Sequence, residues 1–147
     1  MSLMKGKKGL IMGVANERSI AWGISQKLAE AEAELAFTYL GDALKKRVVP
    51  LAEKLNSKVT FSCDVEKKDD VTKLFEDVKS KWGEIDFVVH AIAFSDKSEL
   101  SGEYLNTTRE NFLRSMLISC FSFTEVAKEA CLLYTSEAAD DDHCVGL

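Results

Sequence analysis

The sequence predicts an α/β fold in which a doubly wound parallel sheet lies between two layers of helices. Two observations support this prediction. Short apolar runs alternate with amphipathic helical patterns from residue 9 to residue 130, and each apolar run has the length of a buried strand. Strands that alternate with helices pair in parallel through right-handed crossovers. The strand–helix repeat occurs four times, so we expect a sheet that is truncated after about four strands.

The predicted strands differ in the residues that favour them. The first is a plain apolar run, the second is rich in aromatic and other β-prone residues, and the third alternates apolar with polar side chains. The fourth holds the densest cluster of β-branched residues. In chain order they are Gly9–Met12, Glu34–Tyr39, Lys58–Cys63 and Ile85–Ala91.

Amphipathic patterns predict a helix after each strand. In the first helix, Ile20, Ile24 and Leu28 recur every four residues as an apolar face, and Ser19 suits the N-cap. In the second, Pro50 predicts a kink or a break. The predicted helices are Ser19–Ala31, Asp42–Leu55, Lys68–Trp82 and Thr108–Ala130.

Composition and charge exclude several classes of protein. With 147 residues, of which 46% are hydrophobic and 29% charged, the chain suits one globular domain. A net charge of −5 argues against nucleic acid as a partner. No apolar run approaches the roughly 20 residues that span a bilayer, and no signal peptide opens the chain, so we expect a cytoplasmic protein that does not enter a membrane. The four cysteines lack metal or redox spacing, so we expect reduced thiols and no metal site.

Residues 131–147 differ from the rest of the chain. The helical periodicity of Phe112, Met116 and Phe123 fades at Cys131, and an acidic run without an apolar face follows. One interpretation is a disordered acidic end. The other is that Cys131–Ser136 matches one reading frame of a common sequencing adapter, which would make residues 131–147 an assembly artefact. On either interpretation, residues 1–130 are expected to form the folded unit.

A turn at residues 13–20 joins the first predicted strand to the first predicted helix. Gly13 allows the backbone to approach a ligand closely, and Ala15 keeps the turn small. The helix start at Ser19 and Ile20 offers unpaired N–H groups and the positive end of a helix dipole, which suit a pyrophosphate. Because Ala15 replaces the second glycine of the usual G-x-G-x-x-G pattern, a plain strand-to-helix turn remains the alternative.

Further candidate residues follow the other strands at the same sheet edge, where doubly wound folds bind their ligands. Asp64 can accept a hydrogen bond from an adenine amino group while Val65 packs on the ring, and Ala91–Ala93 are small enough to admit a ribose. Alternatively, Asp64 caps the following helix and the alanines are core residues. The convergence of several such segments at one edge favours a bound dinucleotide.

Together these motifs resemble the enoyl-acyl-carrier-protein reductases, a branch of the short-chain dehydrogenase/reductase superfamily with a Rossmann-like fold. Common members of the superfamily have Thr-Gly-x-x-x-Gly-x-Gly at the first turn and Asn-Asn-Ala-Gly after the fourth strand, and neither occurs here. The resemblance covers residues 6–130. It rests on Gly13-Val-Ala-x-x-x-Ser19-Ile-Ala-x-Gly23, Glu34–Tyr39, Cys63-Asp64-Val65, His90-Ala-Ile-Ala-Phe94 and Thr108-Arg-Glu-x-Phe112.

The resemblance implies a reductase that transfers hydride from NADH or NADPH to a trans-2-enoyl thioester on acyl carrier protein during fatty-acid elongation. It implies a backbone contact to substrate near Ser95 and a homotetramer in which the helix at residues 108–130 contributes to a subunit contact. The cofactor contacts that it implies are Gly13, Ser19, Ile20, Asp64, Val65 and Ile92.

The catalytic residues of the resembled family match no position in this sequence. The family carries Tyr-x6-Lys after a fifth strand, whereas here no lysine follows Lys128 and Tyr134 lies in the divergent tail. We therefore expect residues 1–130 to be the NAD-binding, amino-terminal half of a reductase. No turnover is expected from the 147 residues alone.

The sequence favours NADH over NADPH as the cofactor. A 2′-phosphate needs a basic residue directly after the second strand, and Leu40–Asp42 offers none. Lys45–Arg47 come a turn later and are expected on a solvated helix face. His90 is expected to be a hydrogen-bonded structural residue without catalytic or metal-binding chemistry.

Two other functions remain open at this point. One is a short-chain dehydrogenase that acts on an alcohol or ketone, although residues 116–121 lack the asparagine that those enzymes use. The other is a non-catalytic domain that senses NAD and signals by association.

Overall fold

Within residues 2–134, which the computed structural model describes, four parallel strands form one sheet. The predicted α/β fold is confirmed. The strands are β1 (Lys8–Met12), β2 (Glu34–Tyr39), β3 (Val59–Ser62) and β4 (Phe87–His90). Their order across the sheet is β3-β2-β1-β4, so the chain leaves β1 on one side and returns on the other. The point where the order reverses, between β1 and β4, is where folds of this class bind ligands.

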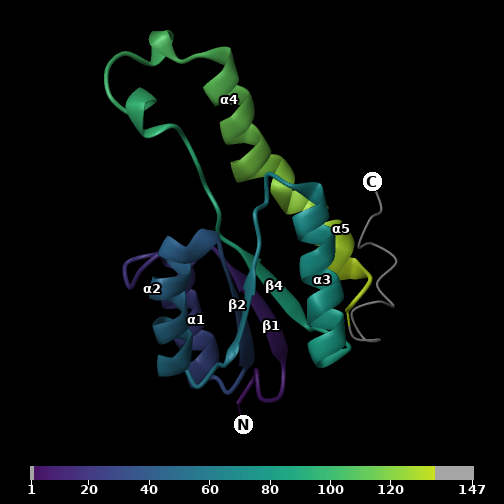
Figure 1. The fold of residues 1–147 in the computed structure, drawn as a ribbon. Coiled ribbons are helices and arrows are strands. Elements are labelled where there is room, and N and C mark those ends of the chain that lie inside the picture. The colour runs from purple at the N-terminus through teal and green to yellow at the C-terminus, as the bar shows by residue number, and fades with distance from the viewer. Residues whose placement is uncertain (1, 135–147) are drawn as a thin grey trace.

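Helices cover both faces of the sheet. The helices α1 and α2 lie on one face and α3 and α5 on the other, whereas α4 and the segment before it rise beyond the carboxyl ends of the strands (Figure 1). Their bounds are α1 (Ile20–Glu30), α2 (Gly41–Lys54), α3 (Lys68–Trp82), α4 (Arg109–Met116) and α5 (Ser122–Cys131).

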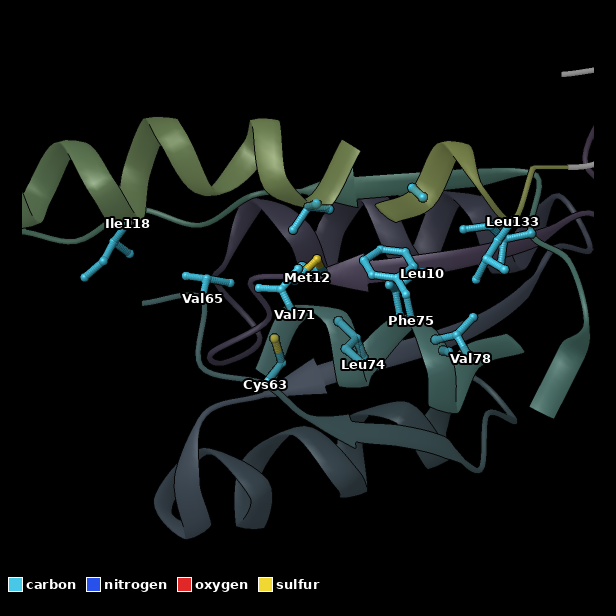
Figure 2. Close-up of a cluster of buried hydrophobic side chains, with 14 residues drawn as sticks. Leu10, Met12, Cys63, Val65, Val71, Leu74, Phe75, Val78, Ile118 and Leu133 are labelled. Carbon is cyan, nitrogen blue, oxygen red and sulfur yellow. The ribbon is translucent and has the colours of Figure 1, made fainter. Parts of the chain in front are cut away.

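Two apolar cores result, because successive side chains of a strand point to opposite faces of a sheet. Leu10 and Met12 lie in the core beneath α3 and α5 (Figure 2). Ile11 points the other way, into the core beneath α1 and α2, together with Phe37 and Val48. All five side chains are fully buried. A strand covered on both faces needs the continuous apolar run that the sequence shows.

The apolar face predicted for α1 is wrong. Ile20 is 79% exposed and Ile24 is 37% exposed, whereas Ala21 and Ser25 are buried against the sheet. The Ser25 hydroxyl donates to the Ala21 carbonyl at 2.7 Å, so burial leaves it paired. Trp22 is buried with them, so the packed face of α1 combines one large and two small side chains. Of the predicted face, Leu28 alone packs against the core.

Helix α2 continues through Pro50, so the predicted break is wrong. Proline at this position removes the hydrogen bond to the Lys46 carbonyl, four residues earlier. Both residues are exposed, and water can therefore satisfy that carbonyl. The helix continues after Pro50 to Lys54, and Leu51 and Ala52 pack into the core beneath it.

The helix predicted over residues 108–130 is interrupted by a π-helical turn at Leu117–Phe121, which joins α4 to α5. The sequence pattern does not show this turn. Ile118, within it, is buried, as are Val126 and Ala130 of α5. The residues whose periodicity suggested the buried face are about half exposed: Phe112, Met116 and Phe123.

The segment between β4 and α4 is held to α4 by one buried amide. Asn111 accepts a hydrogen bond from the Asp96 amide at 2.8 Å and donates to Ser95 Oγ at 3.2 Å and to Glu99 Oε2 at 3.1 Å. Glu99 in turn accepts from the amide and hydroxyl of Thr108, the N-cap of α4. The segment is therefore anchored at several points although it stands away from the sheet (Figure 1).

The described chain ends beside β4. The Ile85 amide donates to the Leu133 carbonyl at 2.8 Å, and Ile85 forms an isolated parallel bridge with Tyr134. Leu133 is buried in the core beneath α3 and α5. Most of the predicted divergent tail, residues 135–147, lies outside the described residues. No helix within residues 2–134 is long and apolar enough to cross a bilayer.

Candidate functional site

A cavity of about 310 Å³ opens at the carboxyl ends of the strands. It lies at the sheet edge where the sequence predicts a dinucleotide site. Segments that follow all four strands contribute to its wall, together with α4 and the π-helical turn. The predicted residues that line it are Gly13, Ala15, Asp64, Val65 and Ile92. The remaining predicted residues, Ser19, Ile20 and Ser95, do not line it.

Gly13 is required by the packing of β1 against β4. Its φ angle is +110°, which side chains disfavour, and a Cβ atom built on it would lie 2.0 Å from the Ala91 carbonyl oxygen. The Ala91 amide donates to the Met12 carbonyl at 2.9 Å, so the two backbones are hydrogen-bonded at this point. Ala15 and Ala93 add further small residues to the cavity wall. Backbone, not side chain, therefore forms this part of the wall.

Ser19 occupies the N-cap position of α1, as predicted, but its side chain does not cap the helix. The hydroxyl donates to the Asn16 carbonyl at 2.6 Å and accepts from the Ala15 amide at 3.4 Å. It therefore holds the turn after β1 in shape. Ile20 begins α1, and as a first-turn residue its N–H has no carbonyl of an earlier turn to bind.

Asp64 closes a tight turn at the cavity wall. Its Oδ1 accepts from the Glu66 amide at 3.1 Å, and its Oδ2 lies 3.4 Å from Lys67 Nζ. Lys67, not Asp64, is the N-cap of α3, so the alternative of a helix cap is wrong. The side chain of Asp64 is 19% exposed, which leaves part of the carboxylate facing the cavity.

Apolar side chains line the cavity beside Asp64. Val65 is 7% exposed and Ile118 is 6% exposed, and both face the same cavity. Burial, together with the charges of Asp70 and Asp64, raises the pKa of the Cys63 thiol to about 12. The thiol therefore stays protonated and acts as an apolar part of the wall. A polar carboxylate beside apolar surface suits a flat heteroaromatic ring with an amino group.

Ser95, the predicted substrate residue, lies just beyond the cavity. Its Oγ accepts a hydrogen bond from Asn111, so its position is fixed by the anchored segment after β4. Before it, the amide and carbonyl of Phe94 are both bonded to the Ser119 hydroxyl, at 2.9 and 3.2 Å. Ser119 belongs to the π-helical turn, and such turns often occur at functional sites. Sequence reasoning missed Asn111 and Ser119.

Two charged residues of the cavity wall were also not predicted from the sequence. Arg114 on α4 and Glu66 after β3 form a bidentate ion pair, with both N–O distances 2.8 Å. The Arg114 guanidinium lies over the Phe94 ring, with 4.4 Å between its central carbon and the ring centroid. The two residues are 48 positions apart, and no motif links them.

His90 has the structural role that the sequence predicts. Its Nε2 lies 2.8 Å from Ser122 Oγ, and the Ser122 hydroxyl donates to the Ile118 carbonyl at 2.7 Å. The Ser122 oxygen is thus left to accept from His90. The imidazole also meets the ring of Phe123 edge-on, with 5.6 Å between centroids. Burial lowers the pKa of His90, which keeps the ring neutral at pH 7.

Comparison with known proteins identifies the family. A family model described as enoyl-(acyl carrier protein) reductase matches residues 13–139. The chain belongs to this family. Among curated enoyl-acyl-carrier-protein reductase relatives, enoyl-[acyl-carrier-protein] reductase [NADH] 2 of Rhizobium meliloti is 62% identical over 128 residues, which cover 87% of this chain and 48% of the relative. The corresponding reductase of Bacillus cereus is 45% identical over 132 residues.

Solved structures of enoyl-acyl-carrier-protein reductases share the fold. The crystal structure of FabI from Candidatus Liberibacter asiaticus has a TM-score of 0.88 and 53% identity, and the match covers 90% of this chain and 52% of that one. The reductase from Anaplasma phagocytophilum, solved in complex with NAD, has a TM-score of 0.85, 53% identity and coverages of 89% and 50%. The chain thus spans about half the length of the relatives that it matches. The alcohol dehydrogenase and NAD-sensor alternatives find no support here.

Proposed function

We propose that this chain is the NADH-binding half of an enoyl-acyl-carrier-protein reductase. The observation that supports it most strongly is the convergence of Gly13, Ala15, Asp64, Val65 and Ile92 on one cavity at the switch point of the sheet. Relatives at 45–62% identity are named as NADH enzymes. NADH supplies the hydride when it is bound, and the protein supplies position and environment.

The residues of the cavity fit a dinucleotide. The turn at Gly13 and Ala15 presents backbone without bulk. Beside the cavity, the start of α1 offers the Ile20 N–H and a positive dipole end for a pyrophosphate, whereas the Ser19 N–H already donates to the Asn16 carbonyl at 3.2 Å. Asp64 provides an acceptor for an exocyclic amino group. Ile92, two residues after β4, lies near the reversal of strand order, where the reactive end of a dinucleotide is expected.

NADH is proposed over NADPH because the residues after β2 carry no positive charge. Leu40 and Gly41 are neutral, and Asp42 would repel a 2′-phosphate. Lys45, Lys46 and Arg47 are exposed on α2, as predicted for a solvated face, and Lys45 lies over the Tyr39 ring at 5.8 Å. A structure of the Bacillus cereus reductase contains NADP+, so the residues of each chain, and not the fold, must set this preference.

The substrate that accepts the hydride is proposed to be a trans-2-enoyl thioester on acyl carrier protein. The reaction is proposed to take place in the cytoplasm. Ser95 is proposed to contact it from the segment after β4. The enolate formed during the reaction needs a hydroxyl donor, which the resemblance assigns to a tyrosine with a nearby lysine. Neither matches a position in the printed sequence, so the 147 residues alone are proposed to bind cofactor without turnover.

Assembly into a homotetramer is proposed to involve α4, α5 and the π-helical turn between them. Their exposed face carries large apolar side chains that are 45–61% exposed. They are Phe112, Leu113, Met116, Phe121 and Phe123. Large apolar side chains that gather on one helical segment and remain this exposed are typical of protein–protein contacts.

Residues 1–130 are proposed as the NAD-binding unit and residues 131–147 as an unrelated tail. The alignment with the Rhizobium meliloti relative spans 128 residues, although the family model extends to residue 139. Resequencing the codons for residues 125–147 from an independent library tests this proposal. A genomic sequence that continues differently after about residue 130 supports it, whereas an unchanged sequence contradicts it.

A chimera tests the proposed activity. Residues 1–130 are joined to the carboxyl-terminal half of the Rhizobium meliloti relative, and NADH oxidation is followed at 340 nm with a trans-2-enoyl thioester. We expect reduction by the chimera and none by the 147-residue chain. A well-folded chimera that binds NADH but reduces no enoyl thioester would contradict the proposed activity, while the proposed cofactor site would stand.

A further inference from the structure

Arg114 differs from every other residue of the cavity wall. Among the described residues that line the cavity, it is the one lysine or arginine, whereas Asp64 and Glu66 are the two acids. It lies on α4, the helix that stands away from the sheet (Figure 1). It is thus a single cationic side chain in a largely apolar wall.

The contacts of Arg114 join three separate segments of the chain. Two hydrogen bonds of 2.8 Å connect it to Glu66, in the turn that Asp64 closes after β3. Its guanidinium also covers the ring of Phe94, in the segment after β4. The Ser119 hydroxyl holds the Phe94 backbone from the π-helical turn. Arg114 therefore lies where α4 and the turns after β3 and β4 meet.

An ordinary surface ion pair would contribute little, because solvent screens it and two long side chains must be ordered. The side chains of Arg114 and Glu66 are 47% and 28% exposed, so screening applies to this pair as well. Two features raise its value. The pair is bidentate, which fixes the plane of the guanidinium, and the guanidinium carbon lies over the Phe94 ring. Lysine could supply the charge but not this geometry.

We propose that Arg114 is a positioning residue of the cofactor cavity. By binding Glu66 and lying over the Phe94 ring, it holds the turns after β3 and β4 against α4. The three walls then move together, and release of the bound dinucleotide is slowed. This inference rests on the proposed function, because it takes NADH as the occupant. Arg114 acts through Glu66 and Phe94 and is not assigned a contact with the dinucleotide.

A double-mutant cycle on the 147-residue chain tests the proposal. The NADH dissociation rate is measured by stopped-flow fluorescence for Arg114→Ala, Glu66→Ala and the double variant. If the pair acts as a unit, each single variant dissociates about 5-fold faster, and the double variant does so to the same extent. Arg114→Lys retains the charge without the bidentate geometry and is expected to resemble Arg114→Ala. Arg109→Ala, on the same helix and exposed, is the matched control and should leave the rate unchanged.

Three results separate the possible failures. A wild-type chain that binds no NADH contradicts the proposed function, whereas binding with unchanged rates in the Arg114 and Glu66 variants contradicts the positioning role alone. Effects that multiply in the double variant would mean that Arg114 and Glu66 act independently, and would overturn the proposed pair. Amide hydrogen exchange without ligand gives an independent readout. The Glu66 and Phe94 amides should exchange faster in Arg114→Ala at an unchanged unfolding midpoint, and equal exchange would also overturn the proposal.

Discussion

Gly13 shows how one residue can serve the fold and the cavity at once. Because a Cβ atom at this position would lie 2.0 Å from the Ala91 carbonyl oxygen, Gly13→Ala must push β1 and β4 apart and also strain a φ angle of +110°. We expect a loss of about 3 kcal/mol in the free energy of unfolding. Urea denaturation followed by circular dichroism measures it.

Gly41→Ala is the matched control for this prediction. Gly41 also has a positive φ angle, +66°, but a Cβ atom there would meet nothing within 4 Å. Its substitution should cost only the backbone term, about 1–2 kcal/mol. Equal losses for the two variants would show that the contact with Ala91 has no energetic role. Any loss of NADH affinity in Gly13 variants is inseparable from this packing effect.

Asp64 offers a cleaner test of cofactor binding. Asp64→Asn retains an oxygen that can accept from the Glu66 amide, but it removes the charge from the proposed adenine contact. A hydrogen bond to a charged group exceeds a neutral one by about 1.4 kcal/mol, so we expect an about 10-fold rise in the NADH dissociation constant. Calorimetry measures it. Asp64→Ala should also lower the free energy of unfolding, because the hydrogen bond from the Glu66 amide is lost. Wild-type affinity for NADH in Asp64→Asn would show that the Asp64 carboxylate does not contact the cofactor.

Gly13, Asp64 and Ile92 could be predicted from the sequence because their role depends on their place just after a strand. Each follows a strand, and the carboxyl ends of parallel strands meet at one edge. Arg114 and Glu66 follow no such rule. Their pairing depends on where α4 stands relative to the turn after β3, and that geometry is set by tertiary contacts between residues 48 positions apart.

At the scale of elements, periodicity predicted where helices form but not always which face they bury. The Ile20 and Ile24 face of α1 is exposed, whereas Ala21, Trp22 and Ser25 are buried, so the spacing of large apolar residues indicated the wrong face. The π-helical turn at Leu117–Phe121 could not be predicted either. Its extra residue is stabilised by contacts, such as Ser119 with Phe94, that the local sequence does not encode.

The packing of α5 on β4 should depend on pH through His90. Burial lowers the pKa of His90 in the folded chain below the ordinary value of about 6.5, so the unfolded chain binds a proton first as the pH falls. Stability should therefore be full above about pH 6.5 and decline below it. Urea midpoints at pH 7 and pH 5 measure this decline.

His90→Gln is the control for the pH effect. Glutamine can still donate to Ser122 Oγ but does not titrate, so the midpoint of this variant should change little between pH 7 and pH 5. Carboxylates whose pKa values lie below their usual range, such as Glu66 beside Arg114, lose their contribution only at lower pH. A decline of equal size in wild type and variant would assign the pH dependence to other groups.

At the scale of the whole molecule, the exposed apolar face of α4 and α5 predicts self-association. Light scattering after size-exclusion chromatography should find the 147-residue chain larger than a monomer. Met116→Lys combined with Phe123→Lys should shift it toward the monomer, because charges on both sides of such a contact repel and resist desolvation. Leu3→Lys, at an apolar residue that is 89% exposed outside this face, is the control. A monodisperse wild-type monomer would contradict the proposed subunit contact.

The central claim is that these four strands and their helices build a binding site for NADH without the catalytic residues. Isothermal titration of the folded 147-residue chain with NADH tests it most directly. We predict saturable binding at one site per chain, weakened in Asp64→Asn. A chain whose circular dichroism shows the α/β fold but which takes up no NADH would contradict the claim.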